Sequence, residues 1–189
     1  MSVSNCHVPH DSRIPPAGDA ATYDTIALLN ELLRHTVAVR NLYKSARCQA
    51  ANLDVSHLRS MFDAHYQEQL RLVDVLVDRI RVLGGANYIL AGTFLQGPLP
   101  SYAPHGHSAP NRLLRDLLNA HELVLSMART AGTHRGVQPE PSAVHDFAVG
   151  QVVLANELQG DYLQEQLVYL DREGRFASAT TFSGSDVDE

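Results

Sequence analysis

The sequence predicts an all-α protein, a four-helix bundle with one long crossover between its second and third helices. Three observations carry this prediction. Four long segments repeat apolar residues at spacings of three and four, no segment shows the alternation of a strand, and the connections run short, long, short. The helical domain is expected at 22–172. Residues 1–21 and the acidic stretch 173–189 are expected to be flexible tails because both are small and polar in composition.

The first two helices are predicted from caps and apolar stripes. Thr22 or Asp24 can begin the first helix, which should run to about Ala50. Its apolar face comprises Ile26, Leu29, Leu33, Val37 and Leu42. Ser56 can begin the second helix, and Gly84 followed by glycine is typical of a left-handed C-terminal cap. The apolar stripe of this second helix comprises Leu58, Phe62, Tyr66, Gln69, Val73, Leu76, Ile80 and Leu83.

After the second helix, a long crossover has room for one short helix at 86–96 before a proline-rich stretch. The third helix should begin after Ser108, end near Thr130 and be closed by Gly132. Its apolar face comprises Leu113, Leu117, His121 and Val124. The fourth helix is expected from Ser142 to about Asp171, with a close helix contact at Gly150 and Gly160. One long crossover in such a bundle is the topology of ferritin-like folds.

Composition limits the function classes. The formal net charge of −6 argues against a general nucleic-acid-binding surface, which is normally basic. Cys6 and Cys48 form no CxxC pair and no disulfide framework, so a reducing compartment fits. The chain begins without the apolar run of a signal peptide, and no segment has the roughly 18 apolar residues of a membrane span. We therefore expect a cytoplasmic protein without a membrane partner.

A polar stripe on the second helix carries Arg59, Asp63, Asp74 and Asp78, which lie within about 100° of one another at about 100° per residue. Three carboxylates beside an apolar face indicate either a metal site at a subunit contact or a salt-bridge network. Residues alone leave both interpretations open.

The second helix also carries a family resemblance. HLRSMFDAHYQEQLRLVDVLVDRIRVLGG, at 57–85, resembles the central helix of the Dps miniferritins, the DNA-protection proteins from starved cells. Segments 28–44 and 111–129 are similar to the first and third helices of that family, and the resemblance covers about 25–171. It implies a homo-oligomeric shell of twelve subunits that oxidises Fe(II) with hydrogen peroxide and stores ferric mineral. Iron is thus the metal that the resemblance implies.

In that family, a di-iron site lies between two subunits, one of which supplies two histidines and the other carboxylates from the central helix. On the matching positions, Asp63 and Asp74 correspond to the aspartates and Asp78 to the glutamate. The two histidine positions hold Arg47 and Arg59. Cys48 also departs from the family, which usually has tryptophan there.

The arginines change the expected chemistry. Fe(II) favours imidazole and carboxylate ligands, whereas a guanidinium is always protonated and has no acceptor atom. Arginine instead fits carboxylates in a bidentate fork. The resemblance and this departure together predict a degenerate ferroxidase site, in which Arg47 and Arg59 bridge Asp63, Asp74 and Asp78 across the dimer contact.

Other metal sites remain as alternatives. A site inside one bundle could use His65, Glu157 and Asp161, although the chain has no Glu-x-x-His pair of the kind found in bundle di-iron sites. His65 lies about 200° from Asp63 around the helix and cannot join the aspartate stripe. Surface pairs, namely His105 with His107 and His7 with His10, could capture zinc or copper.

Three functions follow as hypotheses. The first is a Dps-like shell for iron sequestration and oxidative-stress protection with an impaired ferroxidase site. The second is a non-enzymatic shell or interaction protein, and the third is a ferroxidase with a relocated site inside the bundle. Direct DNA binding is not expected, because the N-terminal tail has Arg13 but no lysine and the chain ends in DVDE.

Overall fold

The computed structural model describes residues 17–50, 56–86, 110–133 and 142–182. These residues form α1 (Ala17–Ala50), α2 (Ser56–Val82), α3 (Pro110–Thr133) and α4 (Ser142–Phe182), without a strand in the described ranges. The predicted all-α bundle is confirmed. None of the helices in the described ranges is both long and apolar enough to cross a membrane.

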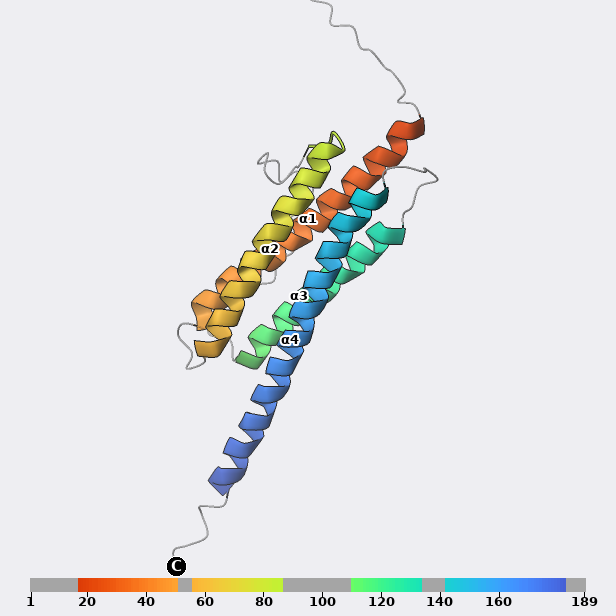
Figure 1. The fold of residues 1–189 in the computed structure, drawn as a ribbon. Coiled ribbons are helices and arrows are strands. Elements are labelled where there is room, and N and C mark those ends of the chain that lie inside the picture. The colour runs from red at the N-terminus through yellow and green to blue at the C-terminus, as the bar shows by residue number, and fades with distance from the viewer. Residues whose placement is uncertain (1–16, 51–55, 87–109, 134–141, 183–189) are drawn as a thin grey trace, which may run out of the picture.

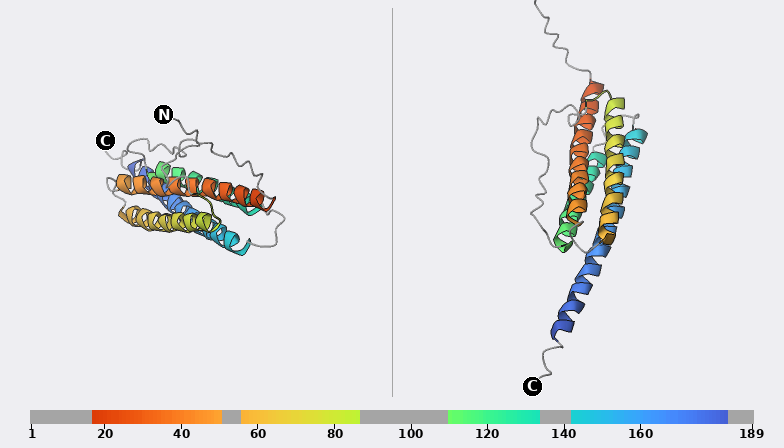
Figure 2. Two further views of the ribbon diagram at one scale, coloured as in Figure 1. Left: turned by 90° about the horizontal axis from the view of Figure 1, so that it is seen from above. Right: turned by 90° about the vertical axis from the view of Figure 1, so that its left-hand side faces the viewer.

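The helices pack as two hairpins (Figures 1 and 2). α1 packs along α2 and α3 along α4, while α1 also contacts α3 and α2 also contacts α4. The end of α2 and the start of α3 lie at opposite ends of the bundle, as the predicted long crossover requires. The short helix expected at 86–96 falls almost entirely outside the described residues.

The apolar faces predicted from the sequence form the core. Leu29, Leu76 and Leu117 are fully buried, and each contributes about 1.5–3 kcal/mol relative to an exposed side chain. All five apolar residues predicted for the face of α1 are buried. Gln69 on α2 and His121 on α3 lie in the same core. Two polar residues thus occupy positions that helical spacing assigns to apolar packing.

The end of α2 is closed as its glycines predict. Gly84 has φ 76°, and its N–H donates to the Arg81 carbonyl over 2.9 Å. The Gly85 N–H donates to the Ile80 carbonyl over 2.9 Å, which completes a Schellman cap. A Cβ on Gly85 would lie 2.7 Å from Cγ2 of Ile26. Glycine here therefore allows the end of α2 to approach α1 closely.

Three helix ends differ from the prediction. α1 begins at Ala17, inside the expected tail, and α3 continues through Gly132 to Thr133. α4 continues past Gly174 to Phe182, ten residues into the segment assigned to the C-terminal tail. The physical reason is the same for both glycines: one glycine costs a helix only about 1 kcal/mol relative to alanine, which neighbouring helix formers can offset.

The glycines inside α4 do not make the close contact expected of them within one chain. A Cβ on Gly150 or Gly160 would meet no atom within 4 Å. The close contact predicted for these two glycines is therefore absent from the single subunit.

Candidate functional site

The aspartate stripe begins with an ion pair between α1 and α2. The Arg47 guanidinium donates to the Asp63 carboxylate at short range, and both side chains are partly exposed, at 35% and 49%. The hydrogen bond to Asp63 raises the pKa of Arg47. The guanidinium also lies over the Tyr66 ring, 5.6 Å from its centroid. Arg47 and Asp63 therefore pair within one chain, whereas the predicted pairing across a dimer contact stays a prediction.

Arg59 is one helical turn before Asp63, whereas the two other aspartates of the stripe lie far from this pair. Asp74 follows Asp63 by eleven residues, which is about 16 Å along a helix. Asp78 has its own neighbour, Arg81, at 3.7 Å, and Arg59 is exposed. In the described part of the chain, no three His, Cys, Asp or Glu side chains are grouped to hold a metal. A site that combines these residues across two subunits stays a prediction.

The alternative site inside the bundle is not assembled by the described residues. Glu157 is half exposed and lies 3.8 Å from Arg129 of α3, and Asp161 is exposed. His65 instead contacts the Oη atom of Tyr43 on α1. Within one chain, the described side chains of His65, Glu157 and Asp161 are not grouped to hold a metal, and a site that uses them stays a prediction. Residues four apart on α4 share a face, but this face points outward while His65 points into the bundle. His105, His107, His7 and His10 lie outside the described residues.

The centre of the bundle holds a polar cluster instead. The Oη atom of Tyr43 lies 2.6 Å from Nε2 of His121 and 3.0 Å from Nδ1 of His65. Tyr43 is fully buried and His121 nearly so. The three residues come from α1, α3 and α2, so a single phenol connects three helices.

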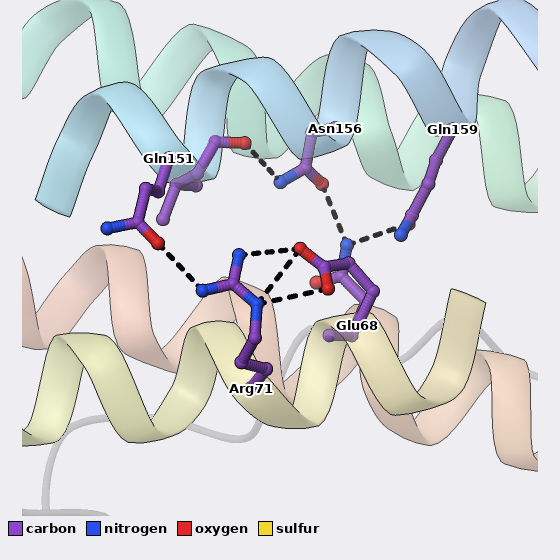
Figure 3. Close-up of polar contacts among 7 residues, drawn as sticks. Glu68, Arg71, Gln151, Asn156 and Gln159 are labelled. Carbon is purple, nitrogen blue, oxygen red and sulfur yellow. Dashed lines mark hydrogen bonds and ion pairs between the residues drawn. The ribbon is translucent and has the colours of Figure 1, made fainter. Parts of the chain in front are cut away.

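Three amide side chains extend this cluster to α4. Nδ1 of His121 lies 2.7 Å from Oδ1 of Asn156, and Nδ2 of Asn156 donates to the Val152 carbonyl over 2.7 Å. Nε2 of Gln69 donates to Oε1 of Gln159 over 2.9 Å and, at 3.3 Å, to Oδ1 of Asn156. Figure 3 shows Asn156 and Gln159 pointing from α4 toward α2. The cluster consists of Tyr43, His65, Gln69, His121, Asn156 and Gln159, and we call it the central network.

Burial keeps the central network neutral. Desolvation lowers the pKa of His65 to about 4. The pKa of His121 is also lowered to about 4, by burial above all and by the nearby His65, against the raising effect of its Asn156 hydrogen bond. Burial raises the pKa of Tyr43 well above its usual value. Among the side chains that the structure describes, none of the buried ones is an aspartate or glutamate. The core therefore offers no carboxylate to a cation.

The outer edge of the α2–α4 contact is charged. Arg71 on α2 forms an ion pair with Glu68 at 2.6 Å, and its Nη1 donates to Oε1 of Gln151 on α4 over 2.7 Å. Figure 3 shows this surface bridge beside the buried amides. At this level of the α2–α4 contact, the neutral amides thus lie inside and the ion pair lies outside.

A comparison with family models decides the fold family. The model described as "Ferritin: Ferritin-like domain" matches residues 26–134, more than half of the chain. This chain belongs to the ferritin family. Its four-helix bundle is accordingly a ferritin-like one, as the sequence predicts.

Solved structures of ferritin-like proteins have similar folds. DpsC from Streptomyces coelicolor is 26% identical over 82% of this chain and 91% of its own, with a TM-score of 0.63. A bacterioferritin from Rhodobacter capsulatus, with a metal-free dinuclear site and a heme iron, gives 18% identity, 79% and 87% coverage and a TM-score of 0.63. A dodecameric thioferritin from Bacteroides fragilis is 13% identical over 84% of this chain and 98% of its own, with a TM-score of 0.66. These last two show likeness of fold alone.

One curated relative is more similar in sequence. It is an uncharacterized protein in the bpoA2 5′ region of Kitasatospora aureofaciens, 35% identical over 108 residues, which are 56% of this chain and 70% of the relative. Its name states neither a family nor an activity, so the family assignment rests on the ferritin-like model match.

Sequence reasoning on this ferritin-family chain missed the central network. Tyr43 and Asn156 were not singled out, and His65 was weighed only as a metal ligand. A signal was present, because Gln69 and His121 both fall on faces that are otherwise apolar. Polar groups at such positions are buried, and buried polar groups require hydrogen-bond partners. Searching the other helices for those partners would have pointed to this region.

Proposed function

We propose that this chain forms a Dps-like miniferritin shell that sequesters iron and protects against peroxide in the cytoplasm, with an impaired ferroxidase site between its subunits. The ion pair between Arg47 and Asp63 carries this proposal. It places a guanidinium on a carboxylate that the Dps pattern would offer to iron. The similarity to DpsC, over nine-tenths of that chain, supports the choice of shell type.

Electrostatics explains the impairment. A divalent iron about 4 Å from a guanidinium meets a repulsion of several kcal/mol even at an effective dielectric near 20. Asp63 is also occupied by its charge-assisted hydrogen bond, which iron would have to break. Fe(II) is the substrate of such a shell, so weaker binding at this position slows its oxidation and leaves slower mineral growth elsewhere.

The surface of α4 supports assembly into a homo-oligomer. Its exposed apolar residues are Leu154, Leu158, Tyr162, Val168 and Tyr169. Apolar residues gathered on one exposed helix favour a protein contact, and open space beside Gly150 and Gly160 leaves room for a neighbouring chain. We propose a dodecamer, which native mass spectrometry would detect as a particle of twelve chains.

The decisive experiment compares Fe(II) oxidation by peroxide and by oxygen in three proteins. The unchanged chain should oxidise iron slowly. The double variant R47H/R59H should oxidise it faster, because imidazoles then join the carboxylates Asp63, Asp74 and Asp78. R71H is the control, because Arg71 of α2 is, like Arg47 of α1, a partly exposed arginine in an ion pair, and its variant should leave the rate unchanged.

Two outcomes would contradict this function. Fast stoichiometric oxidation by the unchanged chain would place a working site elsewhere. Complete absence of oxidation and mineral, also in R47H/R59H, would favour the non-enzymatic shell. An anomalous map of an Fe(II)-soaked crystal adds a direct check. A peak at Asp63, with ligands near 2 Å, would show that Arg47 does not block the position.

A further inference from the structure

A group of basic side chains lies along the C-terminal half of α1. Arg40, Lys44 and Arg47 follow one another at spacings of four and three, so they share one face of the helix. Lys44 is exposed, and the two arginines are partly exposed. On α2, the exposed Arg59 comes one turn before Asp63, the ion-pair partner of Arg47. We call Arg40, Lys44, Arg47 and Arg59 the basic patch.

Three of these four cations have no acidic partner in the described part of the chain. Arg40 donates to the neutral side chain of Asn41, and Lys44 and Arg59 form no ion pair with a described residue. Arginines elsewhere do pair with carboxylates, namely Arg34, Arg71, Arg81, Arg115 and Arg129. The basic patch therefore keeps positive charge available to an anion, on a chain whose formal net charge is −6.

The chain itself carries a matching anion. SGSDVDE, at 183–189, has three carboxylates and no Lys or Arg, and it follows α4 outside the described residues. We call it the acidic segment. In an extended chain, residues two apart such as Asp186 and Asp188 point to the same side and lie about 7 Å apart. Arg40 and Lys44 are about 6 Å apart along α1. The spacing of the two aspartates thus suits the two cations.

We propose that the acidic segment of one chain docks on the basic patch of a neighbouring copy, where its aspartates pair with Arg40 and Lys44. The inference rests on the homo-oligomer proposed above and names a contact that holds its subunits together. Because the contact consists of exposed ion pairs, it is sensitive to salt.

The acidic segment starts far from the bundle of its own chain. Tyr169 of α4 lies beside His57 at the start of α2, with ring centroids 6.4 Å apart. The 13 residues from Tyr169 to the end of α4 extend about 20 Å beyond that level (Figure 1). Asp188 comes six residues after α4, and an extended chain covers that distance in about 20–22 Å. Even a segment that turns straight back thus brings Asp188 only to about the level of His57.

The basic patch lies further along the bundle than this level. Arg47 contacts Asp63, which is six residues and about 9 Å along α2 from His57. Lys44 is three residues, or about 4.5 Å, further from the same end of the bundle. The remaining gap of roughly 14 Å is longer than an aspartate and a lysine side chain together. Pairing with Lys44 therefore requires a second chain, and the projecting end of α4 carries the acidic segment outward to one.

Competing anions fit the basic patch less well. The phosphates of a nucleic acid would meet subunits of formal net charge −6, which repel them. The aspartates on α2 of another copy are also available, but Asp78 already lies 3.7 Å from Arg81. The acidic segment has three carboxylates without a cation of its own, so charge complementarity favours it.

A chemical test can be specific because Lys44 is the single lysine of the sequence. A water-soluble carbodiimide joins a carboxylate to an adjacent amine as an amide, without a spacer. On the assembled full chain, this reagent should produce covalent dimers, and peptide mass spectrometry should show Lys44 linked to Asp186 or Asp188. Lys44→Arg keeps the charge but has no side-chain amine, so its variant should lose this link.

Charge reversal and salt separate docking from chance proximity. Arg40→Glu retains the amine of Lys44 but reverses one charge of the basic patch, so the yield of dimers should fall severalfold. Arg112→Glu is the matched control, because Arg112 is another exposed arginine without an ion pair among the described residues but lies on α3. Its variant should keep the yield. The yield should also fall in 1 M salt, where the Debye length is about 3 Å instead of about 8 Å.

Several results would overturn the proposal. A link between Lys44 and the acidic segment within one chain would contradict the need for a neighbour, and a link to Asp74 or Asp78 would place α2 of another copy on the basic patch. An assembled particle without any Lys44 link would show that the acidic segment does not dock there. If that particle binds duplex DNA in a gel shift and its Lys44→Glu variant does not, the occupant is a nucleic acid.

The test is independent of iron chemistry. Slow or fast Fe(II) oxidation leaves the cross-linking result unchanged, so the two proposals can fail separately. A chain that stays monomeric in native mass spectrometry would overturn the proposed assembly and this inference together.

Discussion

Two pairs of polar residues on the same two helices behave in opposite ways. Tyr43 and Arg47 are one turn apart on α1, and His65 and Asp63 are two residues apart on α2. The inner pair, Tyr43 and His65, is joined by a hydrogen bond between neutral groups in the bundle centre. The outer pair, Arg47 and Asp63, is an ion pair at the helix edge, where both side chains keep part of their contact with water.

The difference shows that the depth of a side chain within the bundle decides whether it pairs as a neutral group or as an ion. In the centre, an ionised group would lose its hydration, so the histidines stay neutral and buried donors such as Nδ1–H of His121 depend on a protein partner. At the edge, water screens the charges, and the ion pair adds little to stability while remaining free to exclude a cation. Removal of a hydrogen-bond partner should therefore lower the free energy of unfolding in the central network, and removal of an ion-pair partner at the edge should change it little.

Among the substitutions, the largest effect on stability is expected at Asn156. Asn156→Ala removes the acceptor of His121 and the more distant of the two acceptors of Gln69. The buried N–H of His121 is then left without a partner, which costs about 1–3 kcal/mol. Urea unfolding monitored by circular dichroism would measure the loss. Gln151→Ala on the same helix is the control, because Gln151 contacts Arg71 at the surface, where most substitutions change stability by less than about 0.5 kcal/mol. Equal losses of unfolding free energy in Asn156→Ala and Gln151→Ala would contradict the inference that buried partners stabilise the bundle more than surface partners do.

A change of pH should also alter the stability of the central network. The pKa values of His65 and His121 are about 4 in the folded chain and about 6.5 when unfolded. Between these values only the unfolded state takes up the protons, so stability is retained above about pH 6.5 and falls as the pH drops toward 4. The slope should reach up to about 1.4 kcal/mol per pH unit for each histidine.

Unfolding free energies measured across this pH range would check that slope. His121→Asn should reduce it by about half, since one of two titrating groups is gone. His57→Asn serves as the control, because His57 is exposed on the same helix as His65, and its variant should keep the full slope. A stability that is flat from pH 7 to 4.5 would show that the two histidines are not held neutral.

The smallest effect is expected at the edge. Arg47→Ala should leave the unfolding midpoint nearly unchanged, because an exposed ion pair gains little in water. The ion pair should nevertheless matter for binding, so the same variant should take up Fe(II) more readily at Asp63, as measured by equilibrium dialysis. Arg34→Ala is a comparable change, because Arg34 pairs with Glu31 on the outer part of α1. It should alter neither property.

The fold could be predicted from the sequence because helical spacing is a local signal. The stripes on α1, α2 and α3 identified the buried faces, and the two glycines after α2 identified its cap. The far ends of α1 and α4 could not be placed. Helix termination by a lone glycine such as Gly174 is a balance of about 1 kcal/mol, which neighbouring residues can reverse.

The candidate site was predictable only in part. The resemblance pointed to Arg47 and Asp63, which do pair, but the sequence did not show that one chain suffices for this. The central network depends on which residues of four helices lie at the same height in the bundle. Tyr43 and His121 are 78 residues apart, and no spacing rule connects them before the helices are packed.

The length of α4 has a consequence for measurements in solution. At 1.5 Å per residue, its 41 residues extend about 60 Å, whereas the 27 residues of α2 extend about 40 Å. Its last turns project beyond the other helices (Figures 1 and 2). Short helical stretches without tertiary contacts open readily in water. Amide hydrogen exchange near Phe182 should therefore be fast in an isolated subunit and slow wherever a neighbouring chain covers this end, which makes the projecting turns a built-in reporter of assembly.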